Sequence, residues 1–100
     1  MAVFSAATNG GHSVLITVSG KFDLHSHRDF RGSYCNENPA AAYTLDLTKT
    51  ESIDSSALGI MLLLREFAGG DDADIIIRGC SENIKKIFKY TNFEKLFSYS

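Results

Sequence analysis

The stretch "ESIDSSALGIMLLLREF", residues 51–67, places an acid and two hydroxyls directly ahead of the most apolar run in the chain. Asp54 or Ser55 is suited to be a helix N-cap, because its side chain can accept a hydrogen bond from the free backbone N–H groups of the first turn. The pattern predicts a helix over residues 56–68, ended by a Gly-Gly pair. A single cap would suffice to start this helix, so the two adjacent hydroxyls require a further explanation.

Apolar residues cover more of this predicted helix than one core-facing stripe. One side carries Leu58, Met61, Leu62 and Arg65, and another carries Ala57, Ile60, Leu64 and Phe67. A helix packed on a sheet buries one side, so we expect part of this surface to meet a neighbour or a partner. Gly59 supports the expectation, because a glycine within a helix costs about 1 kcal/mol relative to alanine and usually marks the close approach of another group.

Two strand candidates flank the helix. Residues 42–48 ("AYTLDLT") carry apolar side chains on one face, and residues 74–79 ("DIIIRG") form a continuous apolar run, as in a strand buried on both faces of a sheet. The order strand, helix, strand predicts a right-handed βαβ unit with the two strands parallel.

The remaining segments predict further alternating elements. They are two opening strands at 3–7 and 13–19 joined through an Asn-Gly turn, a short helix begun by a Ser26–Asp29 capping box, a helix over 81–90, and a short strand within 95–100. The chain is therefore predicted to be a single α/β domain, residues 1–100, with a mixed sheet.

Composition limits the class of function. The 100 residues are 44% hydrophobic with a formal net charge of −2, which is typical of one globular domain and argues against broad nucleic-acid affinity. The longest apolar stretch, residues 57–64, is too short to cross a membrane, and no secretory leader opens the sequence. We therefore expect a cytoplasmic protein with no membrane contact, in which Cys35 and Cys80 are reduced.

The serines are weak candidates for enzyme nucleophiles. His12, His25 or His27 would have to act as the general base, but no spacing places a histidine beside Ser55 or Ser56, and no GxSxG elbow is present. We expect no enzyme activity and no catalytic residue.

A metal site is the other chemical alternative, because "DLHSHRD" contains Asp23, His25, His27 and Asp29. Histidines two residues apart point apart on a helix, and nothing nearby has a zinc spacing. We interpret these side chains as solvated loop and helix-start residues, and expect neither a metal nor a cofactor.

Several segments together resemble one known family. The strand "TLDLT", then "SIDSSALGIML", "GG" and "DIIIRGCSENIKKIF", are similar to the core of STAS domains, the group named for sulfate transporters and anti-sigma factor antagonists. The early "VSGKFD" is similar to the family's second strand and the loop after it. The resemblance implies a SpoIIAA-like fold: a mixed central β-sheet with α-helices packed mainly on one face.

The family motif, Asp-Ser-Ser/Thr-Gly-Leu-Gly, assigns expected roles to the opening stretch. The position phosphorylated in stand-alone members corresponds to Ser55, and Ser56 is the alternative phosphoacceptor. Ala57 stands where the family usually has glycine. The residues expected to contact a partner are Asp23, Asp54, Ser55, Ser56, Ala57, Leu58, Gly59, Met61 and Leu62.

The resemblance also implies a function. An anti-sigma factor antagonist of this type binds an anti-sigma factor that is also a serine kinase of the GHKL type, is released when that kinase phosphorylates it, and is restored by a PP2C-type serine phosphatase. The alternative is a STAS-type module that controls a biofilm, motility or other non-sigma pathway by partner binding. In both cases a phosphate would add a charge of about −1.5 to −2 beside an apolar surface and oppose docking.

Overall fold

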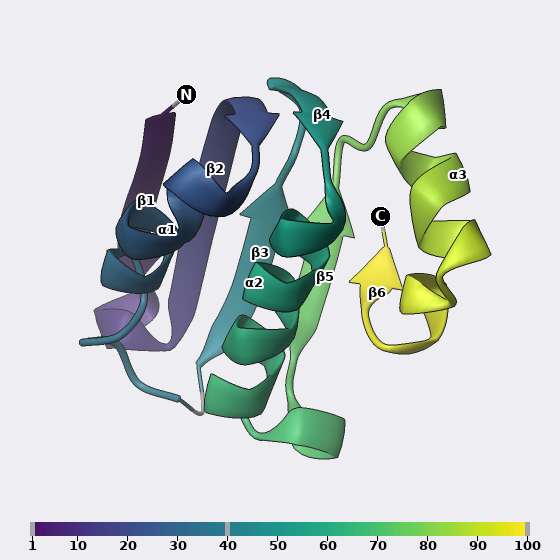
Figure 1. Cartoon of the computed structure of the whole chain (residues 1–100). Coiled ribbons are helices and arrows are strands. Elements are labelled where there is room, and N and C mark those ends of the chain that lie inside the picture. Colours follow the sequence, from purple (N-terminus) through teal and green to yellow (C-terminus); the bar gives the residue numbers. More distant parts are fainter. Residues whose placement is uncertain (1, 40, 100) are drawn as a thin grey trace.

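The computed structural model describes residues 2–39 and 41–99 and has the predicted α/β architecture (Figure 1). The strands are β1 (Ala2–Thr8), β2 (Ser13–Phe22), β3 (Ala42–Asp46), β4 (Thr50–Ile53), β5 (Ile75–Arg78) and β6 (Ser98–Tyr99). The helices are α1 (His27–Gly32), α2 (Ser55–Phe67) and α3 (Glu82–Tyr90). The three helices start within a residue of their predicted positions.

The strands form one mixed sheet in the order β1-β2-β3-β5-β6, and β4 pairs with β2 off this path. The β1–β2 pair is antiparallel, whereas β2–β3, β3–β5 and β5–β6 are parallel. The predicted opening hairpin and the parallel strands of the βαβ unit are therefore confirmed. Between β3 and β5 the chain also makes β4, which the sequence pattern did not predict.

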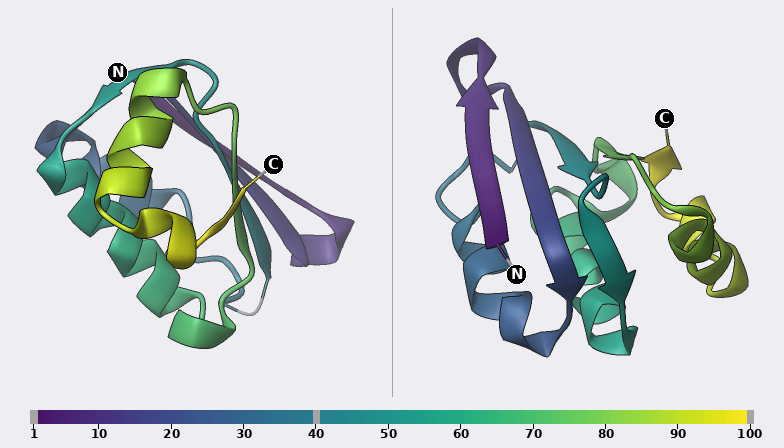
Figure 2. Two further views of the ribbon diagram at one scale, coloured as in Figure 1. Left: turned by 90° about the vertical axis from the view of Figure 1, so that its right-hand side faces the viewer. Right: turned by 90° about the horizontal axis from the view of Figure 1, so that it is seen from above.

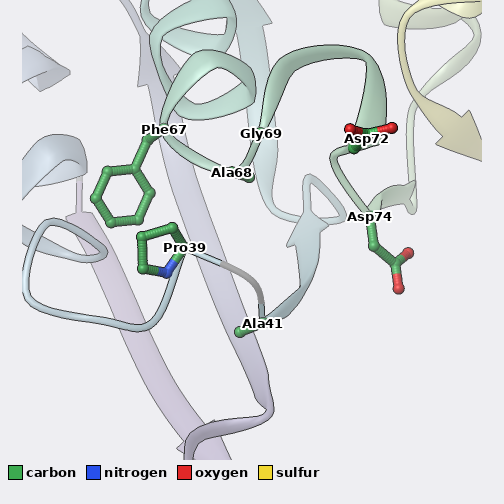
Figure 3. Close-up of a pocket in the computed structure, with 7 residues that line it drawn as sticks. All are labelled: Pro39, Ala41, Phe67, Ala68, Gly69, Asp72 and Asp74. Atoms are coloured by element: carbon green, nitrogen blue, oxygen red, sulfur yellow. The ribbon is translucent and has the colours of Figure 1, made fainter.

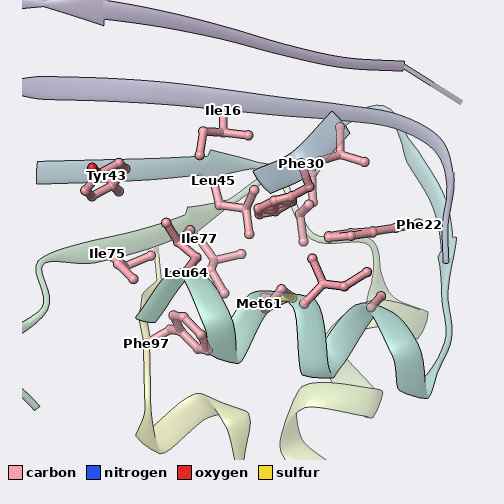
Figure 4. Packing of buried hydrophobic residues seen from close by; sticks show 14 of the residues in the cluster. Ile16, Phe22, Phe30, Tyr43, Leu45, Met61, Leu64, Ile75, Ile77 and Phe97 are labelled. Atoms are coloured by element: carbon pink, nitrogen blue, oxygen red, sulfur yellow. The ribbon is translucent and has the colours of Figure 1, made fainter. Parts of the chain in front are cut away.

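All three helices lie on the same side of the sheet (Figure 2). Strand residues alternate between half-buried and buried, as from Ser13 to Ser19 in β2, because successive side chains point to opposite faces. Ile16, Leu45 and Ile77 from three neighbouring strands pack against Met61 and Leu64 of α2, and all five are fully buried (Figure 4). This core fixes which side of α2 faces away from the sheet.

A tight turn joins β3 to β4. The Asp46 carboxylate accepts hydrogen bonds from the Thr48 backbone N–H (2.9 Å) and hydroxyl (2.6 Å), and the Arg78 guanidinium lies 3.3 Å away. Burial acts to raise the pKa of Asp46, but the hydrogen bonds and Arg78 outweigh it and lower the pKa below its usual value. After the turn, the buried Thr50 hydroxyl donates to the Val18 carbonyl (2.7 Å), which holds β4 against β2.

The capping of α1 differs from the prediction, although its first residue does not. Ser26 precedes α1 but makes no side-chain cap with Asp29. Instead, the Ser26 hydroxyl accepts a hydrogen bond from the Asp23 backbone N–H (3.2 Å), as half of a capping box around a single 3-10 turn, η2 (Leu24–Ser26). The capping box predicted for Ser26 and Asp29 is therefore wrong, because Asp23 begins the helical segment three residues earlier.

Candidate docking and phosphorylation site

At the N-terminus of α2, the residue that caps the helix is not one of the two serines. Asp54 has extended backbone angles, and its carboxylate oxygen Oδ1 accepts a hydrogen bond from the Ala57 backbone N–H at 2.9 Å. Ser55 is the first helical residue and is exposed, whereas Ser56 is half-buried. Because Asp54 is the cap, the Ser55 hydroxyl is not needed to start the helix and stands at the surface.

We expect Asp54→Ala to lower the free energy of unfolding by about 1 kcal/mol, since it leaves the Ala57 N–H without its acceptor. Ser55→Ala is the matched control and should change stability by only a few tenths of a kcal/mol, because Ser55 is not the cap. Chemical denaturation of both variants measures the difference. Equal losses in the two variants would mean that the cap is shared.

The parallel pairing of β2 and β4 brings two loops together. Phe22 is paired with Ile53, so Asp23 and Asp54 leave the sheet as neighbours at the same edge. The Asp54 backbone N–H donates to the Phe22 carbonyl at 3.3 Å. Asp23 in turn caps η2 by accepting a hydrogen bond from the His25 backbone N–H at 3.0 Å. The structure therefore places the Asp23 loop beside the Ser55 loop.

An apolar strip continues from Ser55 along the outer side of α2. Leu62 is 37% exposed and Leu63 49% exposed, and Leu24 of the adjoining η2 is 63% exposed. Leu58 is half-buried. We call this the docking surface, made of Leu24, Ser55, Leu58, Gly59, Leu62 and Leu63. Leu63 and Leu24 were not among the residues selected from the sequence.

Two of the residues expected to touch a partner lie elsewhere. Ala57 and Met61 are completely buried on the side of α2 that faces the sheet. A partner cannot reach these side chains without unfolding the helix, so the expectation that they make direct contact is corrected. Ala57 instead belongs to the hydrophobic core beneath α2.

Gly59 lies on the exposed side of α2. A Cβ built at this position would have no atom within 4 Å outside its own chain neighbours and helix backbone. Close approach of another group of this chain, such as a neighbouring strand, is therefore excluded within the described residues. The absent side chain leaves open surface next to Ser55.

The described residues contain neither a metal-binding cluster nor a membrane-spanning helix. Within residues 2–39 and 41–99, no three His, Cys, Asp or Glu side chains are grouped so as to hold a metal ion. No helix in the same part of the chain has the length and apolarity needed to span a membrane.

A pocket of about 330 Å³ lies at the C-terminal end of α2, between Pro39, Phe67 and Asp74 among others, at the far end of the helix from Ser55 (Figure 3).

Comparison of the sequence with known proteins identifies its family. A family model described as "Mlab, STAS domain" matches residues 5–98. A STAS-domain containing protein of Pseudomonas aeruginosa (strain UCBPP-PA14) is 41% identical over 103 residues, and the match covers 100% of both chains. The chain belongs to the STAS family.

Solved structures agree on the fold of this STAS domain. A putative anti-sigma factor antagonist from Thermotoga maritima superposes with a TM-score of 0.81 at 15% identity, over 97% of this chain and 84% of that chain. The Bacillus cell fate determinant SpoIIAA in its phosphorylated form gives 0.71 at 15% identity, over 99% and 91%. SpoIIAA in its unphosphorylated form gives 0.68 at 18% identity, over 89% and 83%. The expected SpoIIAA-like fold is confirmed.

Proposed function

We propose that this STAS domain is a phosphorylation-controlled protein-binding switch of the anti-sigma factor antagonist type. The observation that carries the proposal is Ser55, an exposed hydroxyl in the first turn of α2 whose capping role is already filled by Asp54. Ser55 is the first choice of phosphoacceptor, and the half-buried Ser56 is the alternative. The domain is a kinase substrate in this proposal, not an enzyme.

The unphosphorylated domain binds through the docking surface. Exposed leucines next to an open glycine offer a partner both apolar contact and close backbone approach, and such patches are a common mark of protein interfaces. The proposed partner is a serine kinase of the GHKL type that is also an anti-sigma factor. The same surface could serve a biofilm, motility or other non-sigma pathway, because the physical switch would be identical.

Phosphorylation of Ser55 would oppose docking without unfolding the domain. The positive end of the α2 dipole and its free N–H groups favour a phosphate within this protein. The added charge of about −1.5 to −2 also stands next to the carboxylates of Asp54 and Asp23. The surface that a partner would meet around Ser55 therefore becomes strongly negative. A PP2C-type phosphatase would restore the binding form.

Gly59→Ala tests the docking surface with two changes of opposite sign. Alanine should raise the free energy of unfolding by about 0.5–1 kcal/mol, because it favours the helix and meets open space. If a partner packs against Gly59, the same methyl group should weaken binding to the kinase by about tenfold, through overpacking at the contact. Thermal unfolding and calorimetric titration measure the two effects.

Glu66→Ala is a suitable control, since Glu66 is exposed near the opposite end of α2. It should leave kinase affinity unchanged. Binding by Gly59→Ala at full affinity would show that the partner does not approach this part of the helix.

A further inference from the structure

The first strand has an unusual combination of exposure and neutrality. Residues 1–20 contain no Lys, Arg, Asp or Glu, although 22% of the chain is charged. The side chains of residues 4–8 in β1 are all exposed, and Phe4 is 66% exposed. Within the described residues β1 pairs with β2 alone and lies at one edge of the sheet (Figure 1).

The outer edge of β1 also lacks the features that normally prevent strand addition. Its pairing with β2 runs without a shift from Ala2↔Ser19 to Thr8↔Ser13, so no bulge bends the edge away. It contains no proline and no lysine. Soluble proteins usually protect an exposed edge of this length by one of these means, because its unpaired N–H and C=O groups can accept another strand.

We propose that the outer edge of β1 pairs with β1 of a second copy of this chain. An antiparallel pair around a two-fold axis perpendicular to the sheet is self-complementary, so one surface serves both copies. The register centred on Ser5 pairs the whole strand and sets Phe4 opposite Ala6 of the other copy. No like charges face each other in this register, and a charged strand from another protein would find no complementary side chain on β1.

The side chains of the pair support this register. Phe4 and Ala6 are paired with Thr17 and Leu15, which are half-buried, whereas the alternate β2 residues point into the core. Phe4 and Ala6 therefore lie on the face of the sheet away from the helices. Across the axis, each exposed Phe4 ring would cover the Ala6 methyl group of the other copy. The pairing therefore buries apolar surface at two symmetric places.

The dimer would leave the docking surface open. A two-fold axis perpendicular to the sheet keeps the helices of both copies on one face and reverses the strand direction. The two Ser55 loops would then lie at opposite ends of a continuous sheet, and each could engage its own partner. The inference is thus independent of the proposed switch, and the two fail separately.

Sedimentation equilibrium of the full chain tests the proposal. The mass of the wild-type protein should rise with concentration from 11.0 kDa to twice that value and no further. Ser5→Lys should weaken the dimer by at least about tenfold, because two lysines would face each other at the axis. Ser52→Lys, on an exposed residue of β4, is the matched control and should dimerise as the wild type does.

Three outcomes would overturn the proposal: a wild-type monomer at every concentration, growth of species beyond the dimer, or equal weakening by both lysine variants. Circular dichroism establishes that the variants are folded. If Ser5→Lys does not fold, isotope-filtered NOE spectra of mixed labelled and unlabelled wild-type protein decide the register. They should show contacts from the Phe4 ring to the Ala6 methyl group of the other copy, and their absence would contradict the pairing.

Discussion

Gly79→Ala is expected to lower the free energy of unfolding by about 3 kcal/mol, from two separate causes. Gly79 has a φ of +75°, which costs an L side chain about 1 kcal/mol or more. In addition, a Cβ at this position would clash with the Thr48 hydroxyl oxygen and lie 2.9 Å from the Thr48 backbone nitrogen. Thr48 cannot move away freely, because Asp46 holds both its N–H and its hydroxyl.

Gly70→Ala separates the two causes. Gly70 has a similar φ of +63°, but a Cβ there would meet nothing within 4 Å. Its substitution should therefore cost only about 1 kcal/mol, the backbone contribution alone. Urea denaturation of the two variants measures the difference. If the free energy of unfolding falls no more at Gly79 than at Gly70, the turn at Thr48 rearranges with little loss of stability.

The Gly79 contact also matters for the site. The turn at Thr48 leads directly into β4, and β4 sets Asp54 and α2 against the Asp23 loop. A displaced turn would therefore reach Ser55 through only one short strand. We expect any folded fraction of Gly79→Ala to bind the proposed kinase partner less well than Gly70→Ala does.

Ser55→Asp is expected to weaken binding to the proposed GHKL-type kinase by roughly 10–100-fold, because it adds a negative charge next to Asp54 and Asp23 at the head of the docking surface. The substitution should not lower the stability of the fold. A carboxylate in the first turn of a helix is stabilising by about 0.3–1 kcal/mol, so the variant should unfold at the same temperature as the wild type or higher. Calorimetric titration and a thermal melt on one preparation measure both effects.

Ser55→Ala is the matched control, since it removes the hydroxyl without adding charge. It should bind within a few-fold of the wild type and keep that affinity after incubation with ATP, whereas the wild type should lose it. Equal binding by the aspartate and alanine variants would contradict the role of Ser55. The same pair of substitutions at Ser56 then decides whether the neighbouring hydroxyl is the switch.

Local patterns predicted most of the fold. The alternating and continuous apolar runs identified β1, β2, β3 and β5, and the caps placed α2 and α3, because these signals depend on nearby residues. β4 was not predicted because it is only four residues long and starts a few residues after β3. Its identity as a strand depends on the distant partners Val18 and Phe22, which no local pattern reveals.

The site was predictable in its chemistry but not in its orientation. The sequence placed Asp54 and Ser55 at the start of a helix, and the β2–β4 pairing then brings the Asp23 loop beside them. Met61 was assigned to the partner side in error. The helix is apolar nearly all round, so only its packing on the sheet shows that Met61 faces inward and Leu63 outward.

Phosphosite mapping by mass spectrometry, on the protein purified from its own cells with and without phosphatase treatment, shows whether Ser55 carries the proposed switch. We expect one phosphate on the peptide that contains Ser55 and Ser56, with fragment ions assigning it to Ser55, and its removal by a PP2C-type phosphatase. If neither serine is modified under any growth condition, the hydroxyls lie beside a constitutive docking surface and the switch is refuted.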